Sequence, residues 1–368
     1  MLPKQPSFYL PPIEVSKPSK PRHYKPVFLL CSLFFLLIVI FGWLHLSSLS
    51  KARQEPKSFV ARYVLPVTFS PDGQVLAAAQ GQVTAQLWIW NLSNNQLQHT
   101  IETGHNAAVW ALAFSPDGKS IVSAGRDDGR LIMWDVQTGN RREIFSGSLN
   151  TTESLFFSFD AGLLINAGSD LKPTIEVWNV QTKRLLYKIQ EAKGNAFAAM
   201  LPDGKTFLTS SGGATNIRDL KTGRVLHIVP TNIHSRQCFK AALSTDGNIL
   251  SLGTRTSEGM SESIEVWNIA TGQFLYASPE NHGSGQVSWK NSLSSLVFSP
   301  NGNLLVSSSI FGTPQVRLRD AQTGKVLRTL PVEAQSLAFS PDGKTLAAGV
   351  QNEVRLWKVD ELLKQEQL

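Results

Sequence analysis

The chain has 368 residues, a formal net charge of +7 and two cysteines, Cys31 and Cys238. Two cysteines exclude a disulfide framework or a cysteine-rich zinc site, and we expect no cofactor or metal. Residues 1–56 hold seven Lys/Arg and two Asp/Glu, whereas the remainder holds 28 and 26. The main domain is therefore almost neutral, so we expect no nucleic-acid partner.

Residues 1–26 contain seven prolines and five Lys/Arg, a composition that cannot bury a core. We predict a flexible tail. The run Pro18–Pro21 fits a P-x-x-P ligand pattern, but a basic tail resting on anionic lipid headgroups explains the same composition more simply.

Val27–Leu46 is an apolar run of 20 residues without Asp, Glu, Lys or Arg. A helix of that length spans roughly 30 Å, the thickness of the hydrocarbon core. We predict a single transmembrane helix followed by a polar linker, residues 47–57. A cleaved signal peptide is the alternative, because Ser48–Ser50 offers small residues at a plausible cleavage position, but the leader and the apolar run are both long for that class.

Five Lys/Arg precede the predicted helix, four of them between Lys17 and Lys25, and Lys51, Arg53, Lys57 and Arg62 follow it. By the positive-inside rule this distribution leans towards a cytoplasmic N-terminus and an exported main domain. The lipid bilayer is then one partner of the chain.

The stretch Leu112–Asp135 sets the pattern for the rest of the chain. Apolar runs at Val109–Phe114, Ser120–Ala124 and Leu131–Trp134 are too short for helices and read as strands. The first two are separated by Ser-Pro-Asp-Gly, in which proline presets φ, aspartate bonds its own backbone and glycine supplies a left-handed residue. The stretch therefore predicts three strands and two tight turns.

This unit recurs seven times, as three markers show. The turn glycine returns at Gly73, Gly118, Gly162, Gly204, Gly247, Gly302 and Gly343. The third strand closes at Trp90, Trp134, Trp178, Arg218, Trp267, Arg319 and Trp357. A turn such as Thr138-Gly139 or Asn94-Asn95 then leads into a fourth strand, for example Gln96–Ile101 or Val225–Val229, in six of the seven units.

Four-stranded units of this length with these markers are typical of a β-propeller, and the chain resembles the WD40 repeat family over residues 58–358. We predict an all-β, seven-bladed propeller over residues 58–360, preceded by the transmembrane helix and followed by a tail, residues 361–368. The last unit has three strands, so Ser58–Arg62 should complete its sheet, as the resemblance also implies. Glu361–Gln365 is the alternative closing strand.

Only the second unit matches the family pattern closely. There the resemblance implies that His105, Ser123, Asp128 and Trp134 form a hydrogen-bonded network that braces the blade. Arg218 and Arg319 replace the tryptophan in the fourth and sixth units, so these blades must be braced otherwise.

The longest connections between markers lie in the fifth and sixth units. We predict that Thr254–Ser263 and Ser278–Asn291 form extended loops side by side on one face of the propeller. Because recognition usually resides in loops on a rigid scaffold, we propose a partner-binding surface there. It consists of Arg255, Glu258, Met260, His282, Trp289 and Lys290.

No nucleophile with a base, paired carboxylates or metal ligands converge in the sequence, so we identify no catalytic residue. The favoured function is a non-enzymatic, membrane-anchored scaffold or adaptor that binds other proteins. The alternative is a propeller enzyme or small-ligand receptor that uses the central channel. Charged or histidine residues that converge on the ring axis would favour this alternative.

Overall fold

The computed structural model describes residues 57–60, 64–80, 85–169, 172–191, 196–211, 214–231, 236–256, 262–280, 293–309, 314–351 and 353–364. Within these residues, no helix is both long and apolar enough to cross a bilayer. The predicted span Val27–Leu46, the tail 1–26 and linker residues 47–56 lie outside them.

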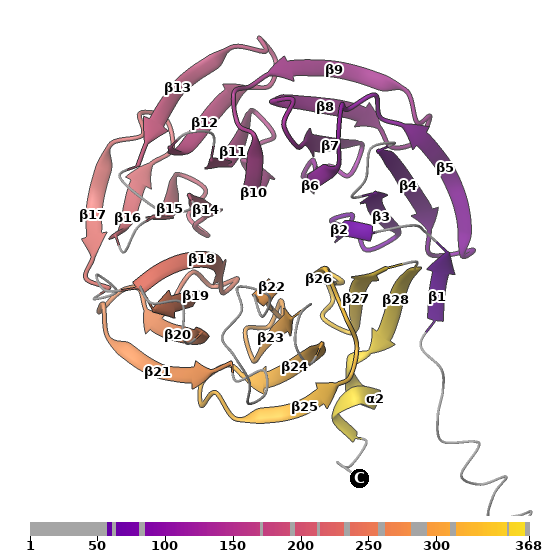
Figure 1. The fold of residues 1–368 in the computed structure, drawn as a ribbon. Coiled ribbons are helices and arrows are strands. Elements are labelled where there is room, and N and C mark those ends of the chain that lie inside the picture. Colours follow the sequence, from indigo (N-terminus) through magenta and orange to yellow (C-terminus); the bar gives the residue numbers. More distant parts are fainter. Residues whose placement is uncertain are drawn as a thin grey trace, which may run out of the picture. The chain divides into compact units, whose positions relative to one another are not determined.

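The described residues of the main domain form seven four-stranded antiparallel sheets arranged as a ring of blades (Figure 1). Blade 1 contains β2 (Val64–Phe69), β3 (Val75–Gln80), β4 (Gln86–Asn91) and β5 (Gln96–Glu102). Blade 2 contains β6 (Val109–Phe114), β7 (Ser120–Gly125), β8 (Arg130–Asp135) and β9 (Arg141–Ser146). Blade 3 contains β10 (Thr151–Phe157), β11 (Leu163–Ser169), β12 (Pro173–Asn179) and β13 (Leu185–Gln190).

The remaining blades repeat this order. Blade 4 contains β14 (Phe197–Met200), β15 (Thr206–Ser211), β16 (Ala214–Asp219) and β17 (Val225–Val229). Blade 5 contains β18 (Arg236–Leu243), β19 (Ile249–Thr256), β20 (Glu262–Asn268) and β21 (Phe274–Pro279). Blade 6 contains β22 (Leu293–Phe298), β23 (Leu304–Ser309), β24 (Gln315–Asp320) and β25 (Val326–Leu330). Blade 7 contains β26 (Ser336–Phe339), β27 (Thr345–Val350) and β28 (Glu353–Lys358), and a helix, α2 (Val359–Lys364), follows it.

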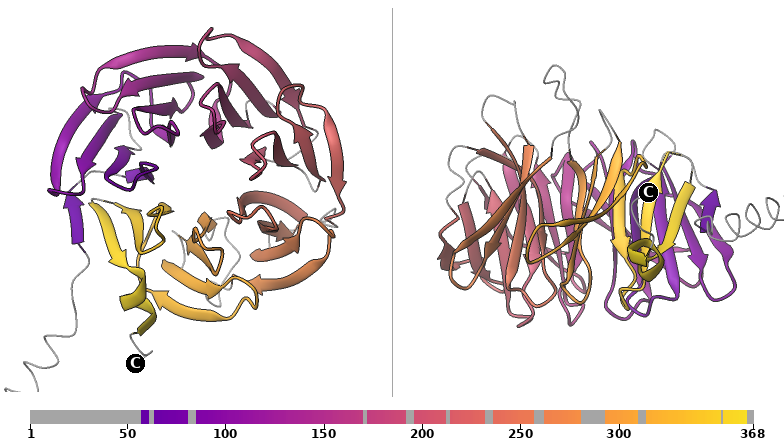
Figure 2. Two further views of the ribbon diagram at one scale, coloured as in Figure 1. Left: turned by 180° about the vertical axis from the view of Figure 1, so that it is seen from behind. Right: turned by 90° about the horizontal axis from the view of Figure 1, so that it is seen from below.

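The first described strand closes the ring. β1 (Lys57–Val60) pairs antiparallel with β28, with Lys57 opposite Leu356 and Val60 opposite Glu353, so it becomes the outer strand of blade 7. Figures 1 and 2 show β1 and β28 next to each other, although they come from opposite ends of the domain. The seven-bladed propeller and its closure by the segment around Ser58 are confirmed.

The core consists of seven hydrophobic clusters, each of which lies between two neighbouring blades. Leu76 and Trp88 of blade 1 pack with Ala347 and Val354 of blade 7, for example. The other clusters join the blades pairwise around the ring. A blade therefore buries both apolar faces only when it has a neighbour on each side, as expected for a repeat architecture.

The Ser-Pro-Asp-Gly turn has the predicted chemistry. In blade 2 the Ser115 hydroxyl donates to Asp117 Oδ1 at 2.6 Å, and the backbone N–H of Lys119 donates to the same oxygen at 3.1 Å. These bonds favour the carboxylate and lower the pKa of Asp117. Gly118 has φ of 69°. The recurring aspartates are thus explained by the turns that they stabilise.

Blade 3 corrects one marker. The residue with left-handed φ is Ala161, at 57°, and its N–H donates to the Ser158 carbonyl as Gly118 donates to Ser115. Gly162 follows the turn instead of closing it. With the turn at Ala161, the distances along the chain to Gly118 and Gly204 become equal, so the repeat is more regular than its glycines indicate.

Two further predictions change at the level of residues. Thr254–Ser263 is not a loop throughout, because β19 continues to Thr256 and Arg255 pairs with Glu262 at the start of β20. Likewise β21 includes Ser278 and Pro279. At the C-terminus, residues from Val359 form α2 rather than a strand, and Leu362 is buried in the cluster between blades 6 and 7. The inserted residues of blade 5 therefore lengthen the hairpin of β19 and β20. At the C-terminus, the folded domain continues past residue 360.

Exchanging the turn residues tests the backbone argument. A left-handed conformation costs a residue with a Cβ roughly 1–2 kcal/mol. We therefore expect Ala161→Gly to raise the free energy of unfolding and Gly118→Ala to lower it, each by about 1 kcal/mol. A Cβ at Gly118 would meet only Pro71 Cδ at 3.8 Å, so no clash contributes. Denaturant unfolding measures both changes; a destabilised Ala161→Gly variant would contradict the assignment.

Candidate interaction surfaces

The structure brings together the four residues that the family resemblance selected in blade 2. Trp134 Nε1–H donates to Ser123 Oγ at 3.0 Å, the Ser123 hydroxyl lies 2.9 Å from His105 Nε2, and His105 Nδ1 lies 2.9 Å from Asp128 Oδ2. A neutral His105 that carries its proton on Nδ1 satisfies every contact in this chain. The network links the loop after β5 of blade 1 to two strands of blade 2.

Burial lowers the pKa of His105 below its usual 6.5, although the hydrogen bond and charge of Asp128 oppose the shift. Burial alone would raise the pKa of Asp128, but bonds from the N–H groups of Arg130 and Asn106 and from His105 lower it. The pair therefore stays as neutral imidazole and carboxylate near pH 7. The His105–Asp128 pair therefore has a structural role in bracing blade 2.

Arginine takes the place of tryptophan in blades 4 and 6 and forms a different brace. In blade 4 Arg218 donates to Thr209 Oγ1 at 3.0 Å and pairs with Glu191 at 2.8 Å. In blade 6 the fully buried Arg319 donates to Ser307 Oγ at 2.6 Å and pairs with Glu280.

The hydroxyl occupies the same strand position in all three braced blades, namely Ser123, Thr209 and Ser307. Each glutamate follows the outer strand of the preceding blade by one residue. The sequence reading did not find Glu191 and Glu280; their position after β13 and β21, together with an arginine in the next blade, is the signal.

The predicted partner-binding residues are largely beyond the described part of the chain. Glu258, Met260, His282, Trp289 and Lys290 lie outside it, and Arg255 is placed by its backbone in β19, opposite Glu262. The proposed surface around blades 5 and 6 therefore stays a prediction.

A different surface emerges on the outer wall of the propeller. The outer strands β5, β9 and β25 each expose one large apolar residue, and those of three consecutive blades expose two or three. These are Leu185 and Leu186 on β13, Val225, Leu226 and Ile228 on β17, and Phe274 and Leu275 on β21. Figure 1 shows these three strands following one another around the ring. We call this set the outer apolar wall. Exposed apolar residues that gather on one part of a protein surface are typical of interaction sites.

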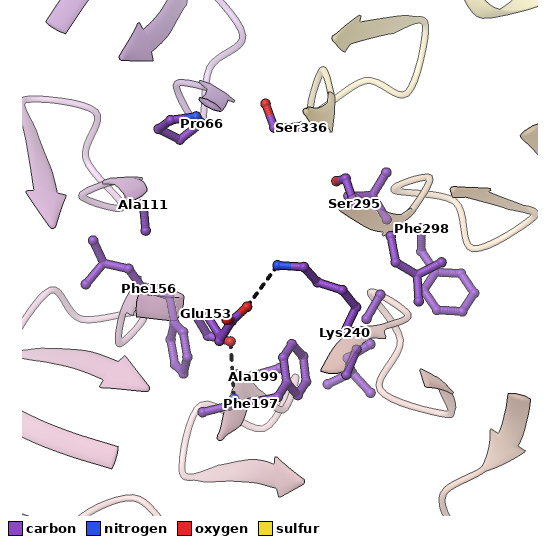
Figure 3. Close-up of a pocket in the computed structure, with 18 of the residues that line it drawn as sticks. Pro66, Ala111, Glu153, Phe156, Phe197, Ala199, Lys240, Ser295, Phe298 and Ser336 are labelled. Carbon is purple, nitrogen blue, oxygen red and sulfur yellow. Dashed lines mark hydrogen bonds and ion pairs between the residues drawn. The ribbon is translucent and has the colours of Figure 1, made fainter. Parts of the chain in front are cut away.

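The central channel encloses a cavity of about 1120 Å³ lined by the inner strand of every blade (Figure 3). Its described lining is mainly apolar and includes Phe156 and Phe197. Two ionisable side chains, Glu153 and Lys240, point towards each other from blades 3 and 5 and form an ion pair at 2.8 Å. Within this lining no histidines or further charges converge, and no group of described residues could hold a metal ion.

Seven radially arranged four-stranded sheets, closed by a strand from the other end of the domain, define a seven-bladed β-propeller. The family model described as "WD domain, G-beta repeat" matches residues 95–135, 279–310 and 324–358. The chain carries WD40 repeats in these segments of a seven-bladed propeller, which confirms the resemblance carried by its turn and tryptophan markers.

Several known proteins have sequences similar to parts of this chain. The chain is 26% identical over 273 residues to apoptotic protease-activating factor 1 of Rattus norvegicus, of which it covers 20% while 73% of the chain is matched. It is 30% identical over 129 residues to small ribosomal subunit protein RACK1y of Oryza sativa subsp. japonica, covering 35% of the chain and 36% of that protein.

The guanine nucleotide-binding protein subunit beta of Oryza sativa subsp. indica is 24% identical over 266 residues and matches 67% of each chain. The chain thus spans only a fifth to about a third of the first two relatives. Among solved structures, Kuenenia stuttgartiensis hydrazine synthase superposes with a TM-score of 0.69 at 15% identity, covering 83% of this chain and 98% of the other. That likeness concerns the fold alone.

The brace of blade 2 predicts acid sensitivity. The unfolded chain takes up a proton on His105 as the pH falls through about 6.5, whereas the folded chain resists it, so stability is complete above that pH and is lost below it. We expect His105→Gln to lessen the loss of stability between pH 7 and pH 5. Denaturant unfolding across this range measures the slope, and an unchanged slope would contradict the assignment.

The brace of blade 6 predicts a large effect of removing its arginine. Arg319→Met leaves Glu280 buried with fewer donors, and breaking a buried pair costs about 3–5 kcal/mol. We expect Arg218→Met to cost less, because its side chain and that of Glu191 are 11% and 12% exposed, against 1% and 3% for Arg319 and Glu280. Adding Glu280→Gln to Arg319→Met should restore part of the loss, and additive effects of the two changes would argue against coupling.

Proposed function

We propose that the chain is a non-catalytic protein-interaction scaffold, held at a membrane by Val27–Leu46 with its propeller exported. The observation that carries this function is the outer apolar wall on blades 3 to 5. A soluble face gains nothing from leaving Leu226 and Ile228 61% and 64% exposed, whereas a docking partner would bury them.

The rigidity of the ring supports the same function. Seven interblade clusters and the braces at His105, Arg218 and Arg319 fix the blades relative to one another, so surface residues are presented without ordering cost on binding. The relatives named above are consistent with a shared platform that serves different assemblies. The loops of blades 5 and 6, with Met260 and Trp289, are a second candidate docking surface.

A receptor or enzyme that uses the channel is the competing function. The cavity and the Glu153–Lys240 pair are the features in its favour. The described lining offers this ion pair but no further titratable groups for proton transfer. We therefore favour the scaffold. An exchange factor or trafficking adaptor on an internal membrane is a special case of it.

Chemical crosslinking in native membranes tests the scaffold. We expect the wild-type propeller to crosslink to a defined set of proteins, and Leu226→Ser with Phe274→Ser to lose members of that set because the apolar contact is gone. Trp289→Ala with Met260→Ala tests the loop surface in parallel. A partner set unaffected by either pair of changes would contradict both surfaces, and absence of any partner would contradict the function.

The same membranes test the orientation. Protease added to intact cells should cleave the propeller, because the positive-inside rule puts it on the outer side. Protection from the protease in intact cells but not in lysed cells would reverse the orientation and leave the scaffold proposal standing.

A further inference from the structure

The outer strand of each blade is a free sheet edge, and most of these edges carry a feature that discourages pairing. Charged residues stand on β1, β5, β9, β13 and β25, and β21 ends in Pro279. Charge and proline are the usual means by which proteins block edge-to-edge pairing. Among the outer strands that the structure describes, β17 (Val-Leu-His-Ile-Val) and β21 (Phe-Leu-Tyr-Ala-Ser-Pro) carry no Lys, Arg, Asp or Glu. Pro230 follows β17 at the register position that Pro279 holds in β21, so in both blades a proline stands only at the end of the edge.

The side chains of β17 are also the most open to solvent of these edges. Its first four residues are all exposed, and Leu226 and Ile228 are the two most exposed large apolar residues in the described chain. β25 makes the comparison direct: it reads Val-Leu-Arg-Thr-Leu, with Thr329 at the position of Ile228. The same scaffold position is polar in blade 6 and apolar in blade 4.

A positive charge marks one end of the edge. Arg224 immediately precedes β17 and is exposed, and it forms no ion pair with any other described residue. Lys221 lies exposed in the same turn. At the other end Pro230 follows the strand and carries no charge. A segment laid along β17 therefore meets the apolar Val225, Leu226 and Ile228, with His227 between them. At one end it meets the cations Arg224 and Lys221, and Asp219 of the same turn offsets part of their charge.

We propose that β17 is the docking edge for an extended segment of a partner protein, which adds a fifth strand to blade 4. The segment has β-branched or other apolar residues along the strand and carboxylates at its C-terminal end. Antiparallel pairing is favoured because it is slightly more stable than parallel pairing, and it places the end of the segment beside Arg224. Main-chain bonds supply affinity, and the contacts with Leu226 and Ile228 supply selectivity.

This inference rests on the scaffold function and specifies its mode. Its test uses the purified full-length chain in detergent micelles and a fluorescein-labelled synthetic peptide. In the peptide, threonine alternates with valine and isoleucine, and two aspartates close its C-terminus. Fluorescence anisotropy measures binding. Control peptides carry proline in place of a central valine, which removes a ladder N–H, or lysines in place of the aspartates.

We expect saturable binding of the acidic peptide and binding weaker by roughly tenfold with the proline peptide. Ile228→Thr, which copies β25, should weaken binding to a similar extent, whereas Thr329→Ile on β25 should leave it unchanged. Arg224→Glu should reverse the preference between the acidic and the lysine peptides. Because these positions are exposed, thermal unfolding should be little changed in each variant.

Three results of the peptide experiment would overturn the proposal: no saturable binding, equal binding of the proline peptide, or binding that is insensitive to Ile228→Thr. Sedimentation of the chain without peptide tests a second copy as the occupant. An association that Ile228→Thr abolishes would mean that the edge pairs with itself, and would also overturn it. If the peptide fails while proteins still crosslink to the propeller in membranes, the scaffold function stands and this docking mode alone is wrong.

Discussion

Closure of the ring is the constraint on which the rest of the molecule depends. Every blade presents two apolar faces, and each face is buried only against a neighbour. An open arc would leave two faces in water at its ends. The pairing of β1 with β28 prevents this, because it joins the start of the domain to its last sheet and completes blade 7. The cost is a contact between residues that are far apart in sequence, which slows folding more than it affects stability.

Inside this closed ring the blades use different hydrogen-bond networks around the residue that closes the third strand. A tryptophan, a serine and a histidine meet between blades 1 and 2, whereas an arginine, a hydroxyl and a glutamate meet between blades 3 and 4 and between blades 5 and 6. All three arrangements place a donor beside a strand hydroxyl and a distant partner from the preceding blade. In blade 3 the indole N–H of Trp178 finds no acceptor among the described residues. The braces refine a fold that the apolar clusters already establish.

Repetition made most of the fold predictable. Markers that keep phase through seven units fixed the number of blades, the strand order and the need for a closing strand, and the fourth strand Val225–Val229 has its predicted bounds. Local irregularities escaped, because they depend on backbone geometry that composition does not record. Ala161 holds a left-handed turn beside an available glycine, and β19 continues to Thr256, past the position where a loop was predicted to begin.

The candidate site was harder to predict for a physical reason. Partners such as Glu280 are recognisable only once the strand ends place them beside an arginine of the next blade, a contact that sequence spacing alone does not define. The exposure of a side chain is likewise not defined by sequence spacing alone. Val225–Val229 reads as an ordinary strand, and only its position at the end of a sheet shows that Val225, Leu226 and Ile228 face water.

The departures from the repeat in blade 4 then separate into two kinds. Arg218 departs from the tryptophan of other blades, but Glu191 and Thr209 satisfy it within the chain. This departure has a structural explanation and requires no partner. The edge of β17 also departs from its counterparts, because its Leu226 and Ile228 are the two most exposed large apolar residues in the described chain. A residue that differs from the repeat but finds its partners within the chain, such as Arg218, contributes to stability. Residues that differ from the repeat and stay exposed, such as Leu226 and Ile228, are the stronger indication of where another molecule binds to a rigid ring.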